Sequence, residues 1–213
     1  MPRRALRKIN PALDVSRHYR EADDLPRPFD PSQLFAKSQP LEVEVGSGKG
    51  LFISAAALRQ PEHNFLGIEV SRKYAHYAAA RLARQQCENA VMICGDALAL
   101  FRDWFPPASL AAVHVYFPDP WWKKRHRKRR VMNEAFLKDV ERTLAPGGAL
   151  HFWTDVEEYY SATVALIAAT IQLEGPVPVP EQPAEHDLDY RTHFERRTRK
   201  NELPVYRAEY QKR

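Results

Sequence analysis

Cysteine is scarce in this sequence of 213 residues, which contains only Cys87 and Cys94. Neither lies in a C-x-x-C spacing, so we expect no structural metal site and interpret both as reduced thiols. Long apolar runs are also missing, because residues 159–173 fall short of the ~18–20 apolar residues of a membrane span. The start, MPRRALRKIN, lacks the apolar segment of a secretory signal. We therefore expect a cytoplasmic protein without membrane contact.

Charge is unevenly distributed along the chain, although the formal net charge is only +5. Residues 123–130 read KKRHRKRR and contain no acid. Residues 1–20 hold six basic residues against one acidic residue, and residues 190–213 hold eight against three. The remainder is acidic, and a hydrophobic content of 44% is enough to form a core. Such segregation favours a polyanionic partner, which the basic segments would attract.

A regular alternation of strand-like and helix-like segments begins at Leu41. We predict strands over 41–45, 64–70, 90–96, 110–117 and 149–155. We predict helices over 51–60, 71–86, a short segment around 98–104, 133–144 and 156–173. Ser71 and Asn133 are the expected N-caps of two of these helices. Strands that alternate with helices predict an α/β fold with a mostly parallel, doubly wound sheet.

The two ends of the chain depart from this alternation. Residues 1–40 are rich in Arg, Asp and Pro, so we predict a basic, partly irregular arm. Residues 41–213 are then one domain that includes the C-terminal tail. Residues 174–183 contain four prolines and are predicted to form an extended loop. A closing strand pair that ends over 203–210, with the last strand antiparallel, makes a sheet of seven strands.

The loop GSGKG, residues 46–50, follows the first strand and precedes the first helix. A phosphate-binding P-loop is excluded because Gly50 follows Lys49, and a dinucleotide fingerprint is excluded because Leu51 stands where glycine is needed. The remaining G-x-G-x-G pattern is typical of S-adenosylmethionine (SAM) sites, although a simple tight turn is the alternative. Glu69 lies 19 residues beyond Gly50, where a carboxylate can accept ribose hydroxyls.

A second motif, FPDPWW, follows the predicted strand 110–117 and runs directly into the basic segment 123–130. The flanking prolines restrict the backbone around Asp119, and the tryptophans offer faces on which a nucleotide base can stack. The adjacent Lys and Arg side chains are suited to phosphates. A nuclear-localisation signal or a solvated surface patch is the alternative for the basic segment alone.

Together EVGSGKG, GIEVSRK, the aspartate of CGDA, FPDPWWKKRHRKRR and RTHFERR resemble the tRNA (guanine-N7-)-methyltransferase family, over residues 41–197. The resemblance implies a Rossmann-like, class I SAM-dependent methyltransferase fold. It also implies methyl transfer to N7 of a guanine in the tRNA variable loop (position 46), giving 7-methylguanosine. The implied ligands are SAM and tRNA, with no metal and no obligate protein partner, and the oligomeric state stays open.

The resemblance also implies roles for individual residues. The cofactor site would consist of Glu44, Gly46, Gly48, Gly50, Glu69, Asp96 and Asp119, with Asp119 also catalytic. The substrate and RNA contacts would come from Lys123, Arg125, His126, Arg127, Lys128, Arg129, Arg130, Asp155, Thr192, His193, Phe194 and Glu195. His193 stands where the family usually has lysine.

Two other functions compete with this prediction. Adenine-N6 methyltransferases use [DN]-P-P-[YFW], whereas Asp119 is followed by a single proline and Trp121. A non-enzymatic RNA-binding protein would suit the basic segments, but it has no use for a glycine loop with acids at the ends of strands. The chemistry itself needs no dedicated base, because guanine N7 carries a free lone pair. A carboxylate such as Asp119 could orient the base and stabilise the cationic product.

Overall fold

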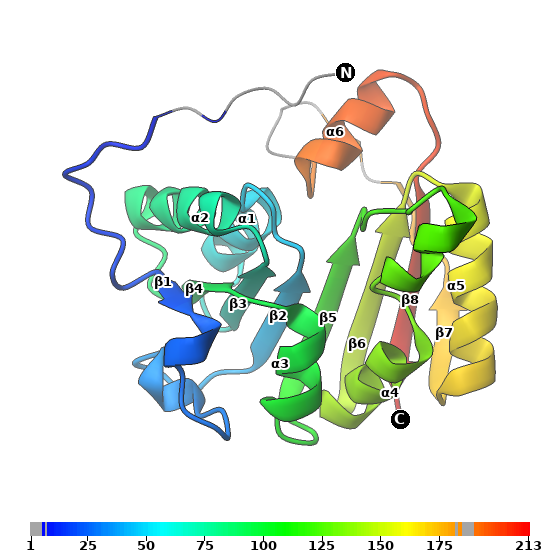
Figure 1. Cartoon of the computed structure of the whole chain (residues 1–213), viewed down its shortest axis with the longest axis horizontal. Helices are drawn as coiled ribbons and strands as arrows, with labels where there is room; N and C mark the ends of the chain where they lie inside the picture. The colour runs from blue at the N-terminus through cyan, green and yellow to red at the C-terminus, as the bar shows by residue number, and fades with distance from the viewer. Residues whose placement is uncertain (1–5, 7, 182, 185–189) are drawn as a thin grey trace.

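The computed structural model of the protein describes residues 6, 8–181, 183–184 and 190–213. These residues form an eight-stranded sheet in the order β1-β4-β3-β2-β5-β6-β8-β7 (Figure 1). The strands are β1 (Tyr19–Glu21), β2 (Leu41–Val45), β3 (Asn64–Glu69), β4 (Ala90–Cys94), β5 (Leu110–Tyr116), β6 (Leu144–Thr154), β7 (Leu173–Val177) and β8 (Tyr206–Lys212). All neighbours from β1 to β6 pair in parallel, whereas β8 is antiparallel to both β6 and β7. The predicted α/β fold with an antiparallel last strand is confirmed.

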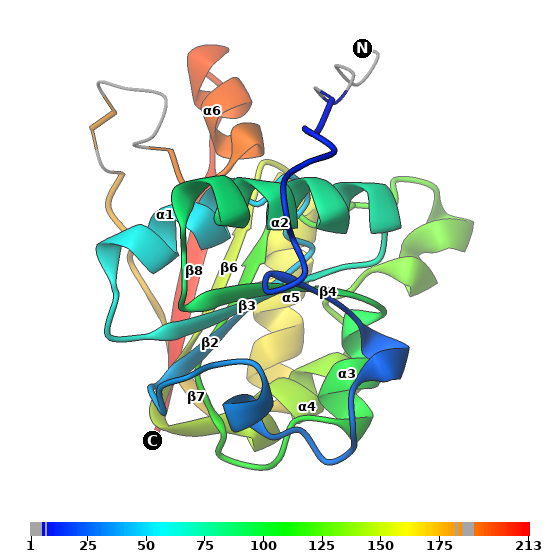
Figure 2. The same ribbon diagram turned by 90° about the vertical axis from the view of Figure 1, so that its left-hand side faces the viewer.

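Helices cover both faces of this sheet (Figure 2). They are α1 (Leu51–Arg59), α2 (Arg72–Gln85), α3 (Ala97–Asp103), α4 (Glu134–Thr143), α5 (Glu157–Thr170) and α6 (His193–Lys200). Helices α1 and α2 pack on one face, over a cluster that contains Phe65, Leu82 and Met92. Helices α3 to α5 pack on the other face, over a larger cluster around Phe136 and Phe152. Because β3 to β5 are buried on both faces, their sequences are largely apolar without a strict alternation, whereas β2 alternates apolar residues with the buried acids Glu42 and Glu44.

The sheet differs from the prediction at its two edges. Strand β1 lies inside the segment that was predicted to be irregular, and it pairs with β4 through only three residues, too few to show a periodic pattern. Residues 1–5 and 7 of that segment lie outside the described residues. At the other edge, β7 includes Gly175 and Pro176, which were predicted to be loop. Proline is tolerated there because an edge strand need not donate every backbone hydrogen bond.

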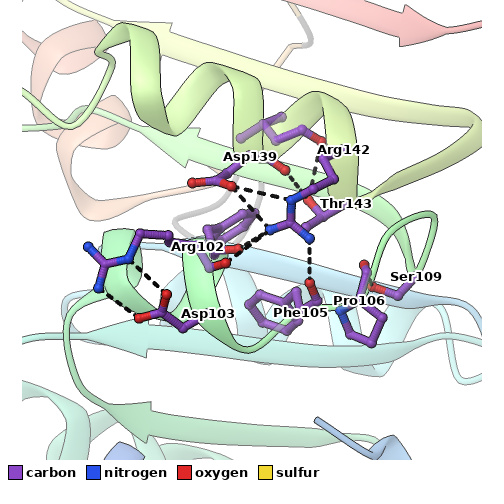
Figure 3. Close-up of polar contacts among 10 residues, drawn as sticks. Arg102, Asp103, Phe105, Pro106, Ser109, Asp139, Arg142 and Thr143 are labelled. Carbon is purple, nitrogen blue, oxygen red and sulfur yellow. Dashed lines mark hydrogen bonds and ion pairs between the residues drawn. The ribbon is translucent and has the colours of Figure 1, made fainter. Parts of the chain in front are cut away.

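Arg142 at the end of α4 joins α3 and α4 at the amino end of β5, away from the site described below (Figure 3). Its guanidinium donates to the carbonyl of Phe105 at 2.8 Å and to the carboxylate of Asp139 at 3.1 Å. Asn133 caps the same helix as predicted, because its side chain accepts from the backbone N–H of Phe136 at 3.1 Å. No helix among the described residues is both long and apolar enough to cross a bilayer.

Candidate active site

A pocket of about 580 Å³ opens at the carboxyl ends of β2, β3 and β5. The chain runs from β2 towards one side of the sheet and from β5 towards the other, so the pocket lies at the topological switch point, where open α/β sheets bind ligands. Its volume is in the range of small-molecule sites, about 300–1,000 Å³. Its lining includes Glu44, Gly46, Ser47, Gly48, Lys49, Glu69, Ser71, Tyr74, Phe117, Asp119, Trp121, Arg129, Thr192, His193, Phe194 and Arg197.

The glycine loop, residues 46–50, turns sharply between β2 and α1. Gly46, Gly48 and Gly50 have φ values of +79°, +53° and +68°, which glycine adopts without the steric cost of a Cβ. Gly50 does not line the pocket, and a Cβ built on it would lie 2.6 Å from the Cβ of Ala78 in α2. The third glycine therefore allows α1 and α2 to pack closely, while Gly46 and Gly48 form the pocket wall.

Glu44 precedes this loop in β2 and is only 4% exposed. Its Oε2 has no hydrogen-bond partner within the described part of the chain. Burial raises the pKa of Glu44 to about 8, and the nearby carboxylate of Glu69 also raises it. A buried carboxylate without a full set of partners is costly, and such groups are concentrated at functional sites.

The two other strand-end acids of the predicted cofactor site differ in their positions. Glu69 lines the pocket, and its two oxygens accept from the backbone N–H groups of Gly48 and Ser71, each at 2.9 Å. Its carboxylate is therefore fixed against the glycine loop. Asp96 is exposed and does not line the pocket, and its Oδ1 caps α3 by accepting from the N–H of Leu98 at 2.9 Å. Its predicted contact with the cofactor stays a prediction.

The PDPW loop, residues 117–122, brings Asp119 to the pocket from the end of β5. Phe117 and Trp121 both have left-handed backbone angles, with φ of +50° and +46°. Non-glycine residues rarely adopt this conformation, and such strain is concentrated at active sites and ligand clamps. The backbone N–H of Phe117 donates to the carbonyl of Trp153 at 2.7 Å, which ties the loop to β6.

Arg130, the last residue of the basic segment, is bonded to the backbone of this loop. Its Nε donates to the carbonyl of Pro120 at 2.8 Å, its guanidinium pairs with Glu158, and it lies 4.4 Å over the ring of Tyr159. Arg130 is only 8% exposed. These contacts support a structural role, and its predicted contact with RNA stays a prediction.

The rest of the basic segment forms a 3-10 helix, η3 (Lys124–Arg129), directly after the PDPW loop. Arg129 lines the pocket and places its guanidinium 5.0 Å from the centre of the Trp121 ring. Arg127 is half exposed and pairs with Glu158 at 3.4 Å. The segment otherwise presents exposed cations at Lys123, Arg125 and Lys128, with the ring of His126 half-buried against Trp121.

Helix α6 supplies the opposite wall of the pocket, above the carboxyl ends of the strands (Figure 1). Thr192 caps it by accepting from the N–H of Glu195 at 3.0 Å. The ring of Phe194 is 44% exposed and stacks on Phe117, with centroids 6.2 Å apart and planes inclined by 16°. The guanidinium of Arg197 lies 4.9 Å over the same ring.

Two residues of the predicted substrate set lie outside the pocket lining. Asp155, just after β6, accepts from the hydroxyl of Thr198 in α6 at 3.5 Å. Glu195 is 3% exposed, accepts from the N–H of Arg191 at 2.6 Å and pairs with Arg207 at 3.4 Å. Both therefore attach α6 to the sheet.

Several residues of the site carried no recognisable signal in the sequence. Tyr74 lines the pocket without belonging to an interpreted pattern, and Ser47 lies in the glycine loop but was given no role of its own. Gly67 in β3 is needed because a Cβ there would lie 2.6 Å from the Ser47 hydroxyl, so it makes room for the loop. An isolated glycine inside a strand can indicate such a close approach, so Gly67 could have been recognised from the sequence on this ground.

The fold has relatives among solved structures. The 16S rRNA (adenine(1408)-N(1))-methyltransferase from Catenulisporales acidiphilia superposes with a TM-score of 0.57, at 19% identity, over 86% of this chain and 92% of that one. A SAM-dependent O-methyltransferase from Thermotoga maritima superposes with a TM-score of 0.53, at 15% identity, over 83% and 60%. The fold, with a pocket at its switch point, is therefore that of class I methyltransferases.

Sequence relatives identify the group within this class. A family model described as "Putative methyltransferase" matches residues 38–208. The tRNA (guanine-N(7)-)-methyltransferase of Rhodopirellula baltica is 53% identical over the whole chain and 81% of its own length. The protein of the same name from Aeromonas hydrophila is 34% identical over 78% of this chain and 67% of its own. The chain belongs to the tRNA (guanine-N7-)-methyltransferase family.

Proposed function

We propose that the protein transfers the methyl group of SAM to N7 of a guanine in the variable loop of tRNA. One observation carries this proposal. The glycine loop, Asp119 and the start of α6 line the same pocket, and the cationic helix η3 contributes Arg129 to its lining. A cofactor site and a polyanion-binding surface therefore meet where a reaction between their ligands can occur.

The residues of the pocket fit SAM in both shape and charge. The wall formed by Gly46 and Gly48 has no side chains, so a ligand can approach the backbone closely. Glu69 keeps acceptor capacity for ribose hydroxyls, since each of its oxygens has two lone pairs and accepts one backbone hydrogen bond. The free Oε2 of Glu44 can accept from the ammonium of the methionine part. When bound, SAM supplies an electrophilic methyl group on a sulfonium centre.

The chain's own residues would then hold the guanine. Asp119 is exposed on a loop whose backbone is restrained by two prolines, so its carboxylate can orient the base and stabilise the positive charge that develops on the ring. The exposed ring of Phe194 and the ring of Trp121 offer stacking faces on the two sides of the pocket mouth. Correct positioning of the attacking nitrogen contributes most of the acceleration, typically ~7–11 kcal/mol in well-oriented systems.

Helix η3 would bind the tRNA backbone. Its exposed Lys and Arg side chains begin next to the PDPW loop, so phosphates bound there would bring the neighbouring nucleotide to Asp119. Such contacts release counterions and make affinity fall steeply with salt.

The direct test is methyl transfer from labelled SAM to unmodified tRNA, followed by identification of the methylated nucleoside. We expect 7-methylguanosine from the intact protein and strongly reduced transfer by Asp119→Asn. Label on adenine, or the absence of transfer, would refute the proposal. SAM binding measured in parallel by equilibrium dialysis separates a failed cofactor site from a wrong acceptor.

A further inference from the structure

Arg191, immediately before α6, inserts its side chain between the tail and the sheet. Its Nη1 donates to the phenol oxygen of Tyr116 in β5 at 2.8 Å. The guanidinium carbon lies 4.8 Å from the ring centre of Trp153, 5.8 Å from that of Tyr116 and 6.0 Å from that of Phe52. Three aromatic rings from α1, β5 and β6 therefore surround this cation. Such contacts are strongest when the charge is shielded from water.

Behind Tyr116, a buried chain of hydrogen bonds crosses the sheet. The Tyr116 hydroxyl lies 2.9 Å from Nδ1 of His114, and Nε2 of His114 lies 2.7 Å from Oε2 of Glu42. The other oxygen of Glu42 lies 2.5 Å from Nδ1 of His63. Glu42 and His114 are 7% and 3% exposed. Tyr116 also lines the pocket, whereas Glu42, His114 and His63 do not, and none of the four has a part in the chemistry described above.

The pKa directions of His114 and Glu42 assign a donor and an acceptor to each of these hydrogen bonds. Burial lowers the pKa of His114 to about 4, so its ring is neutral and carries one N–H. Burial alone would raise the pKa of Glu42, but the bonds from His114 and His63 outweigh it and keep the carboxyl ionised. Nε2–H of His114 therefore donates to Glu42, which leaves Nδ1 to accept from the Tyr116 hydroxyl. The Tyr116 oxygen is then free to accept from Arg191, which can only donate.

Neighbouring groups support the neutral state of His114. The ring of His151 stacks on it at 4.6 Å, and His151 in turn lies 2.9 Å from the carboxylate of Glu209 in β8. A protonated His114 would face both this ring and the Arg191 cation. This series of hydrogen bonds thus begins at the Arg191 cation and ends at the Glu42 carboxylate. Hydrogen bonds aligned in this way polarise one another.

Arg191 connects this chain to α6. Its backbone N–H donates to Oε2 of Glu195, and the next residue, Thr192, caps the helix. Thr192, Phe194 and Arg197 then face the pocket, whereas Arg191 itself does not line it. The guanidinium of Arg191 is directed to the sheet, so it fixes where the helix begins.

We propose that Arg191 is a positioning residue, which holds the substrate-facing side of α6 over the pocket through Tyr116, His114 and Glu42. This inference rests on the proposed function for its kinetic consequences, because the base-stacking face of α6 is placed by this contact. A contact of Arg191 with phosphate is the competing interpretation. A phosphate contact would make KM for tRNA depend on salt through Arg191, whereas a positioning role would not.

The test compares Arg191→Met, which keeps the side-chain length without a donor, with Arg191→Lys, which keeps a charged donor. Arg191→Met should raise KM for tRNA about tenfold, the effect of one lost charged hydrogen bond. Its kcat and the Kd for SAM should stay within about twofold, and Arg191→Lys should restore most of the loss. Arg102→Met, in α3 on the side of the molecule away from the pocket, is the matched control and should leave KM unchanged.

Two further measurements separate positioning from direct binding. If Arg191 only positions α6, the slope of log KM against log salt stays the same in Arg191→Met. Loss of a phosphate contact would lower this slope by ~0.7 for single-stranded RNA. Tyr116→Phe removes only the hydroxyl, so it should raise KM in the same direction. The double variant should be no worse than the worse single variant, because both break one contact.

Amide hydrogen exchange tests the contact without catalysis. Residues 193–200 should exchange about tenfold faster in Arg191→Met than in the intact protein, whether or not tRNA is methylated. Unchanged exchange, a lowered salt slope, or additive effects of the two substitutions would each overturn the inference. If the intact protein does not methylate tRNA but exchange in α6 still accelerates, the proposed function fails and the positioning role stands.

Discussion

Replacing Glu44 by Gln tests whether a buried, ionisable carboxyl belongs to the cofactor site. In the folded protein, burial raises the pKa of Glu44 from 4.5 to about 8. The folded state therefore binds a proton between these two values, whereas the unfolded state has released it. Stability is fully present below pH 4.5 and falls as the pH rises towards 8. Glutamine stays neutral, so the variant lacks this loss.

The magnitude follows from the two pKa values. Each pKa unit corresponds to about 1.4 kcal/mol, so the intact protein loses about 5 kcal/mol by pH 8 through this group. At pH 7 the loss is about 3 kcal/mol. Glu44→Gln should therefore be more stable than the intact protein at pH 7, and the two should converge near pH 4.5. The same substitution should weaken SAM binding, because the bound ammonium favours the ionised form of the Glu44 carboxyl, whereas an amide cannot ionise.

Urea unfolding of both proteins at several pH values from 4.5 to 8.5 measures this difference directly. An exposed glutamate, Glu62, provides the control variant Glu62→Gln, which should follow the intact protein. Parallel pH profiles of Glu44→Gln and the intact protein would refute the assignment of a neutral, buried carboxyl. An unchanged Kd for SAM would show that the carboxyl is not part of the cofactor site.

Three further predictions concern the substrate side and the scaffold. Asp119→Asn should lower kcat by about 100-fold while the Kd for SAM changes less than about threefold, and equal losses in both would contradict a role in chemistry. Arg127→Ala combined with Arg129→Ala should reduce the steepness with which tRNA affinity falls with salt, in a filter-binding assay at several salt concentrations. Arg142→Ala removes donors to the Phe105 carbonyl and to Asp139, so the free energy of unfolding should fall by about 2–3 kcal/mol in urea, whereas an unchanged midpoint would show that this contact does not stabilise the fold.

The sequence predicted most of the central sheet because its strands are buried on both faces and are bounded by loops with strong signals. The segment with Leu98, Phe101 and Trp104 on one face is helical, and Phe101 and Trp104 are buried as its spacing indicates. β1 escaped detection because it spans three residues and depends on pairing with β4. The start of β6 was also predicted too late, at residue 149, since β6 begins at Leu144, directly after α4.

The candidate site was predictable where glycine and proline determine the backbone, as in residues 46–50 and the PDPW loop. Burial of charged side chains was not predictable. Arg130 and Glu195 belong to motifs that suggest solvent-exposed contacts, yet they are 8% and 3% exposed because tertiary partners from distant segments surround them. The series of hydrogen bonds from Glu42 to Arg191 likewise joins residues that are far apart in sequence, so no local pattern indicates it.

Mapping the methylated nucleotide in tRNA tests the central claim most directly. Unmodified tRNA is incubated with the protein and SAM, and reductive cleavage at 7-methylguanosine is read at nucleotide resolution. Cleavage at a single guanine of the variable loop is the predicted result, and it should disappear with Asp119→Asn. Cleavage elsewhere in the tRNA would contradict the proposed position, and methylated tRNA without any cleavage would contradict guanine N7 as the acceptor.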